Sequence, residues 1–180
     1  MVDLEVIQSA YYMVAATGVL VAAIFYMVNL RETTRNRNAA FANSVQQNLQ
    51  NKEWQQRFME VLNMQWKDFE DFRARYDSSV DVENYAKRHS ILISYDIIGW
   101  QFRRGLVGLD FFTDVWALGI VTCWHKFKPI IEGYRGWQYP KGAFRDFEYL
   151  SNVLEKKLVA DDPDFMKKMS TLLEYGLTNQ

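Results

Sequence analysis

The hydrophobic pattern of the chain is dominated by one apolar run near the N-terminus. Residues 6–30 contain no Asp, Glu, Lys or Arg. At a rise of about 1.5 Å per residue, about 20 apolar residues in a helix cross the hydrocarbon layer of a bilayer. The run is long enough to do so with some tilt. The pattern therefore predicts a transmembrane helix within residues 1–30 and a domain that it tethers to the membrane.

A polar segment, residues 31–50, follows the apolar run. Because residues 19–98 contain neither Gly nor Pro, we expect the membrane helix to continue through this segment as a stalk. Phe41, Val45 and Leu49 stand at fourfold spacing and form a narrow apolar stripe. Such a stripe is too thin for independent burial, so it predicts packing on the domain or on a second copy of the chain.

The rest of the chain shows the apolar spacing of amphipathic helices. Segments of this kind follow the candidate N-caps Asn51, Asp81 and Asp110, a short one covers residues 66–76, and two more cover residues 144–154 and 163–173. Each of these patterns is helical rather than alternating. The chain is therefore predicted to be all-α: a compact helical domain over residues 51–135 and a C-terminal helical extension over residues 136–180.

Proline and glycine suggest where the last part of this domain is interrupted. Pro129 removes a backbone donor and disturbs a carbonyl one turn earlier, so a kink or a helix boundary is expected there. Residues 133–142 contain three Gly and one Pro, which predicts a loop between the domain and the extension.

The charges that flank the apolar run predict its orientation. Asp3 and Glu5 precede it, whereas Arg31, Arg35 and Arg37 follow it. Since positive charge favours the cytoplasmic side, we expect a single pass through the cell membrane with the N-terminus outside and residues 31–180 in the cytosol. The three arginines are also candidate contacts for lipid headgroups. A cleaved signal peptide is the competing interpretation, but its positive charges would precede a shorter apolar core.

Within the apolar run, Gly18 and Ala22 place two small side chains on one face of the helix. This small-xxx-small spacing is typical of membrane helices whose backbones approach closely. Small residues are also common in membrane helices that pack on nothing. Both interpretations stay open, with Gly18 and Ala22 as the candidate helix-packing pair.

Composition narrows the range of functions. The net charge of −1 provides no electrostatic case for binding nucleic acid. Cys123 is the only cysteine, which excludes an intrachain disulfide and a multi-cysteine zinc site and agrees with a reducing cytosol. Cys123 and His125 are two positions apart, so on a helix they point away from each other and are a poor catalytic pair. We expect no metal and no cofactor.

The most unusual titratable residues lie in the most apolar predicted helix. His89, Asp96 and Arg103 are spaced seven residues apart, which places them on nearly one helix face. An acid in such a helix needs a partner, because an unpaired buried carboxylate is costly. Asp96 is either a structural residue that pairs with Arg103 or with a base on another helix, or a general base or ligand contact beside His89. We favour the structural role and keep all three residues as the candidate ligand site.

Four segments of the chain carry a resemblance to a known family. They are YMVNLR (residues 26–31), WKDFEDF (66–72), GLVGLD (105–110) and WHKFKPIIEGYR (124–135). Their order over residues 5–135 resembles a family of small prokaryotic membrane-anchored proteins known only as a domain of unknown function, while the tail from residue 136 departs from it. The resemblance implies an N-terminal span and a helical domain, and it implies no reaction.

The chain has no phosphate-binding glycine loop, nucleophile elbow, HExxH motif or EF-hand loop. We therefore predict an interaction module rather than an enzyme: an accessory subunit or a self-associating scaffold on the membrane. Its expected partners are membrane lipid and either further copies of itself or a membrane protein. A small-ligand sensor at the membrane is the alternative, and a hydrolase that uses Asp96 and His89 is the third reading.

Overall fold

The computed structural model describes residues 4–178, and the side chains of residues 4–171 except those of Val6 and of nine positions between 38 and 50. The chain forms two compact units, residues 1–46 and residues 47–180. Seven α-helices and no strand lie in the described part. The all-α prediction is therefore confirmed.

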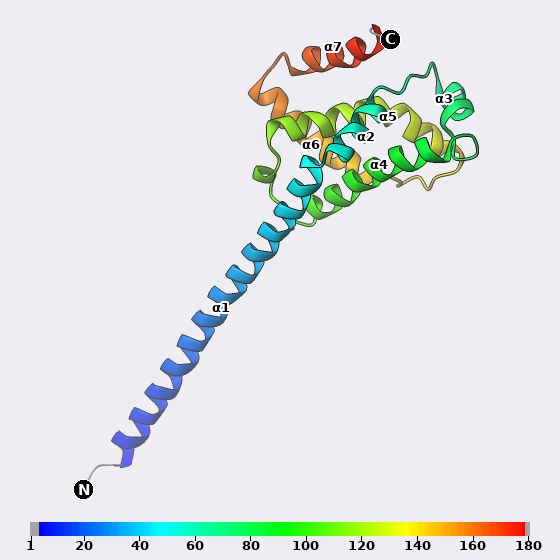
Figure 1. The fold of residues 1–180 in the computed structure, drawn as a ribbon. Helices are drawn as coiled ribbons and strands as arrows, with labels where there is room; N and C mark the ends of the chain where they lie inside the picture. Colours follow the sequence, from blue (N-terminus) through cyan, green and yellow to red (C-terminus); the bar gives the residue numbers. More distant parts are fainter. Residues whose placement is uncertain (1–3, 179–180) are drawn as a thin grey trace. The chain divides into compact units, whose positions relative to one another are not determined.

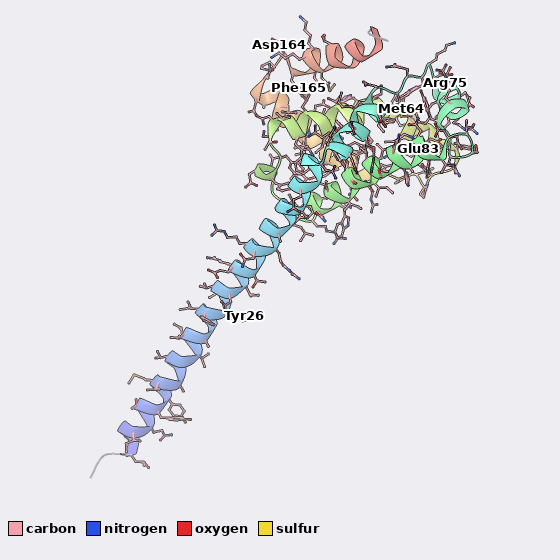
Figure 2. The ribbon with its side chains drawn as sticks, viewed as in Figure 1. Tyr26, Met64, Arg75, Glu83, Asp164 and Phe165 are labelled. Atoms are coloured by element: carbon pink, nitrogen blue, oxygen red, sulfur yellow. The ribbon has the colours of Figure 1, made fainter. Side chains whose placement is uncertain are left out.

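Helix α1 spans Leu4–Gln50 without a break, so the apolar run and the predicted stalk belong to one helix (Figure 1). Its stretch Ile7–Arg37 is long and apolar enough to cross a membrane, and none of the most apolar part is buried. Side chains along it, Tyr26 among them, project freely from the helix (Figure 2). Of the predicted stripe, Phe41 is half-buried, whereas the side chains of Val45 and Leu49 lie outside the described ones.

The second unit is a helical bundle built on three long helices. Its elements are α2 (Lys52–Leu62), α3 (Phe69–Tyr76), α4 (Val82–Arg103), the 3-10 turn η1 (Leu109–Phe111), α5 (Asp114–Trp137), α6 (Arg145–Asp161) and α7 (Phe165–Thr178). Helix α6 packs on both α4 and α5, α2 packs on α4, α3 contacts α4 and α5, and α7 contacts α5 and α6 (Figure 1). The core lies where α4, α5 and α6 meet.

Side-chain caps begin three of these helices. Asn51 accepts a hydrogen bond from the Glu53 amide at 2.8 Å, Asp68 from the Asp71 amide at 2.9 Å, and Asp81 from the Asn84 amide at 2.9 Å. Each satisfies an amide that the first turn leaves without a partner. The predicted caps Asn51 and Asp81 are thus confirmed.

The prediction of a cap at Asp110 is wrong. This residue lies inside η1, and the next helix begins only at Asp114, after Thr113. Because Asp110 is part of the 3-10 turn, it does not stand at the position that precedes the first turn of α5.

Pro129, where a kink or a helix boundary was expected, is no boundary, and the predicted loop does not start at residue 133, because α5 runs unbroken to Trp137. Buried side chains on both sides of the proline, including Phe127, Ile130 and Tyr134, hold the helix against the core although one hydrogen bond is lost. The predicted domain boundary at residue 135 falls inside this helix. Helix α6, assigned to the extension, provides core residues such as Phe147, Leu150 and Leu154, all with no exposed surface.

Candidate functional site

The first turn of α6 lies directly against Gly99 of α4. A Cβ atom on Gly99 would stand 2.1 Å from the carbonyl oxygen of Asp146 and 2.5 Å from its carbonyl carbon. Only glycine permits this distance, because the neighbouring atoms are backbone and cannot rotate away. The contact places the N-terminus of α6 against the face of α4 that carries the candidate residues.

Asp96 caps α6 from the neighbouring helix. Its Oδ1 accepts hydrogen bonds from the amides of Asp146 at 3.0 Å and Phe147 at 2.9 Å. Helix α6 has no cap of its own, since its N-cap position is Phe144, in the left-handed region with φ 57° and without a side-chain bond. A carboxylate at a helix N-terminus is stabilised both by the free amides and by the helix dipole. Asp96 therefore has a structural task.

Arg103 pairs with Asp146 rather than with Asp96. Its Nε lies 2.5 Å from Oδ1 of Asp146, whose side chain is almost completely buried. The expectation that Asp96 forms an ion pair with Arg103 or another base is therefore wrong. The reason is that α6 presents backbone amides to Asp96 and a carboxylate to Arg103, about two turns further along α4.

His89 has aromatic neighbours. Its ring stacks on Tyr85 with centroids 5.0 Å apart and meets Phe144 edge to face at 6.2 Å. Burial, together with the nearby charge of Arg88, lowers the pKa of His89 below its usual value. The three predicted residues thus lie on one face of α4 and face the start of α6, but each contacts a different group. Ligand binding by them stays a prediction.

Sequence reasoning missed Arg88, the most deeply buried charged residue. Only 1 % of its surface is exposed. Its guanidinium lies over the rings of Phe72 at 4.7 Å and Tyr85 at 5.3 Å, and its Nη2 donates to the carbonyl of Tyr76 at 3.3 Å. Burial lowers the pKa of this guanidinium. Cation–π contacts replace water around it.

A signal for Arg88 was present in the sequence. It precedes Ile91 by three positions and Tyr95 by seven, so it belongs to the buried face of α4 by helical periodicity. Its neighbours Lys87 and His89 concealed this, because three basic residues in a row resemble a solvated helix start.

Cys123 and His125 are separated by the fold as predicted. Cys123 is fully buried, and burial raises the pKa of its thiol, which makes it unreactive. His125 points to α6, where its Nε2 lies 2.6 Å from Oε2 of Glu155. Among the residues that the structure describes, no three or more His, Cys, Asp or Glu side chains gather in a way that could hold a metal.

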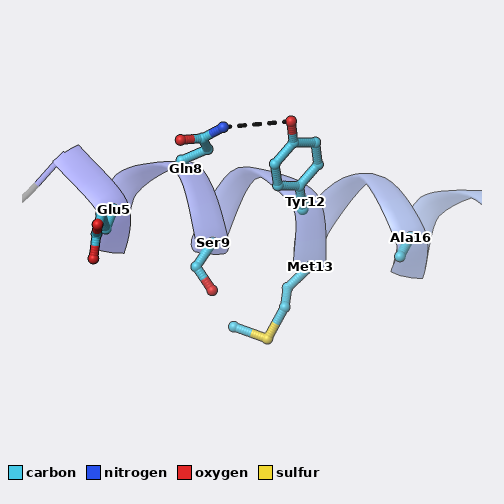
Figure 3. A pocket seen from close by; sticks show the side chains of 6 residues that line it. All are labelled: Glu5, Gln8, Ser9, Tyr12, Met13 and Ala16. Carbon is cyan, nitrogen blue, oxygen red and sulfur yellow. Dashed lines mark hydrogen bonds between the residues drawn. The ribbon is translucent and has the colours of Figure 1, made fainter.

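Two of the hollows on the described surface differ in kind. One follows a single face of α1 beside Gln8, Tyr12 and Ala16 and encloses no space, since every wall comes from the same helix (Figure 3). The other is a groove of about 510 Å³ between α5, the end of α6 and α7. Its apolar walls are Val115, Leu118, Leu158, Phe165 and Met169.

Helix α4 also carries an apolar face toward solvent. Ile93, Ile97 and Trp100 are 39 %, 51 % and 42 % exposed. They lie on the side of α4 opposite Ile91 and Tyr95, which are buried. A helix that is apolar on all sides is normally covered on all sides. This outward face of α4 therefore has the properties of a contact surface.

Comparison with known proteins identifies the family. A family model described as domain of unknown function (DUF4760) matches residues 12–153, so the chain belongs to this family. The match extends beyond residue 135 and takes in the start of α6, in contrast to the expectation that the resemblance ends before it. No curated protein and no solved structure matches the chain.

Proposed function

We propose that this member of the DUF4760 family is a membrane-anchored helical interaction module. In this proposal α1 crosses the membrane once, and the second unit lies in the cytosol and binds another protein chain as an accessory subunit or scaffold. The observation that carries it is the outward face of α4, on which Ile93, Ile97 and Trp100 are exposed side by side. Burying such side chains supplies roughly 25 cal/mol per Å² of apolar surface.

The contacts of Asp96 and His89 do not favour a hydrolase. Two backbone amides occupy the carboxylate oxygen of Asp96, and the ring of His89 stacks on Tyr85. A general base must instead reach the proton that it removes. The groove beside α7, with its apolar walls, supports the second candidate function, a sensor for a small apolar ligand.

The predicted topology leads to a direct test. A reporter fused after Gln180 should show a cytosolic location, because Arg31, Arg35 and Arg37 follow the apolar stretch of α1. Activity of a paired cytosolic and extracytosolic reporter in intact cells measures this. A signal only from the extracytosolic reporter would reverse the orientation.

A second test asks whether α1 is an interface between chains. Gly18→Ile fills an open position, since no atom lies within 4 Å of a Cβ built on Gly18, and it blocks close approach of another helix beside Ala22. Combined with Phe41→Ser, it is expected to reduce the mass of complexes in mild detergent, measured by light scattering. Leu20→Ile, on the other side of the helix, is the matched control. If all variants keep the parent's mass, α1 is not an interface.

A further inference from the structure

The outward face of α4 has an order that points to a specific partner. Along it, Ala86 and Ser90 come first, Ile93 lies in the middle, and Ile97 and Trp100 follow, all of them exposed. The small side chains thus occupy the N-terminal half and the large ones the C-terminal half. A helix face with small side chains at one end and large ones at the other is complementary to a second copy of itself that is rotated by 180° about a two-fold axis.

The spacing makes this fit quantitative. Ala86 lies seven positions before Ile93 and Trp100 lies seven after it, while Ser90 and Ile97 lie three before and four after. In an antiparallel pair of α4 helices that cross beside Ile93, Ala86 of one copy therefore faces Trp100 of the other, and Ser90 faces Ile97. The hydroxyl of Ser90 already donates to the Lys87 carbonyl at 2.8 Å, so packing it against Ile97 leaves no donor unsatisfied.

Charges at the two ends of the face agree with the same pairing. Glu83 (labelled in Figure 2) stands ten positions before Ile93; it pairs with Lys87 at 2.9 Å, and its side chain is still 80 % exposed. The exposed Arg104 stands eleven positions after Ile93. The guanidinium of Arg104 lies 5.7 Å from the centre of the Trp100 ring. In the antiparallel pair each Glu83 meets the Arg104 of the other copy, and the symmetry creates two such contacts.

We propose that α4 packs antiparallel on α4 of a second copy of this chain, with Ile93 beside the two-fold axis. The proposal deepens the function above, on which it rests, by naming the partner and the surface. A lipid surface fits less well, because an anionic bilayer would repel Glu83.

Charge exchange tests the pairing on the full chain in mild detergent. Glu83→Arg and Arg104→Glu, each alone, replace two attractive contacts by two repulsive ones and should raise the dimer dissociation constant about tenfold. The double variant Glu83→Arg with Arg104→Glu should restore the parent value. Glu132→Arg, an equally large charge change on α5, is the control and should leave the constant unchanged. Light scattering over a dilution series measures all four variants.

Disulfide trapping locates the crossing point. Ile93→Cys should form a dimer readily on mild oxidation, whereas Val115→Cys, at an 82 % exposed position on α5, should not. Buried Cys123 stays out of the reaction. Failure of the double variant to restore the dimer, or equal trapping at both positions, overturns the pairing. If complexes with other proteins persist in these cases, the proposal of an interaction module still holds. If the protein is a monomer that co-purifies with no other protein, both proposals are overturned.

Discussion

Replacing Gly99 by alanine is expected to destabilise the second unit strongly. The new Cβ atom would lie 2.1 Å from the carbonyl oxygen of Asp146, so the first turn of α6 has to move away from α4. Forcing extra atoms into a packed core costs typically 1–3 kcal/mol, and we expect about 3 kcal/mol here because the obstacle is backbone. The displacement would also disturb the hydrogen bonds between Asp96 and α6.

Tryptophan fluorescence during urea unfolding in detergent measures this loss selectively, because all six Trp residues lie after residue 50. Gly119→Ala is the matched control. A Cβ atom there would meet the ring of Phe58 at 3.6 Å, an ordinary contact, and the change should be neutral or stabilise α5 by up to about 1 kcal/mol. An unfolding curve of the Gly99→Ala variant that matches the parent's would contradict the described contact between α4 and α6.

Replacing Asp96 by alanine is the second change with a large expected effect. The amides of Asp146 and Phe147 would lose their acceptor in a partly buried contact. An unsatisfied buried group costs about 1–3 kcal/mol, so the two together should lower the free energy of unfolding by about 3 kcal/mol. The loss should appear as a lower urea midpoint with an unchanged slope.

Asp96→Asn separates the shape of the cap from its charge. Both hydrogen bonds end on the same oxygen, Oδ1, and asparagine retains an oxygen at that position. Only the attraction between the charge and the helix N-terminus is lost, about 1 kcal/mol. We therefore expect the stability order parent, Asn, Ala. An Ala variant as stable as the parent would instead favour a ligand-contacting or catalytic role for Asp96, since such residues are arranged for function rather than stability.

Features that depend on a few neighbouring residues were predictable from the sequence. The length of the uncharged run predicted the long apolar helix, because crossing a membrane is a question of length and composition. Asn51 and Asp81 were predictable as caps because their hydrogen bonds reach only two or three positions along the chain. The resemblance of four short segments to a family of unknown function also came from the sequence, and the match of the family model to residues 12–153 confirmed it.

Features that depend on distant segments were not predictable. Pro129 predicted a kink or a boundary from its local chemistry, but α5 does not end there, because burial of Phe127, Ile130 and Tyr134 outweighs one missing hydrogen bond. The glycines from residue 133 onward predicted a loop, although the helix continues to Trp137. The low helix propensity of glycine costs about 1 kcal/mol per residue. This is less than the free energy that packing of α5 against the core contributes.

The sequence by itself determined that the chain is helical, that one helix can cross a membrane, and that Asp96 needs a partner. Tertiary structure alone decided which partner it has, because the amides of Asp146 and Phe147 lie 50 and 51 residues further along the chain. It likewise decided that Arg103 binds Asp146 and that aromatic rings surround Arg88. Helical periodicity fixes the side of a helix on which a residue lies, whereas the group opposite depends on how the helices pack.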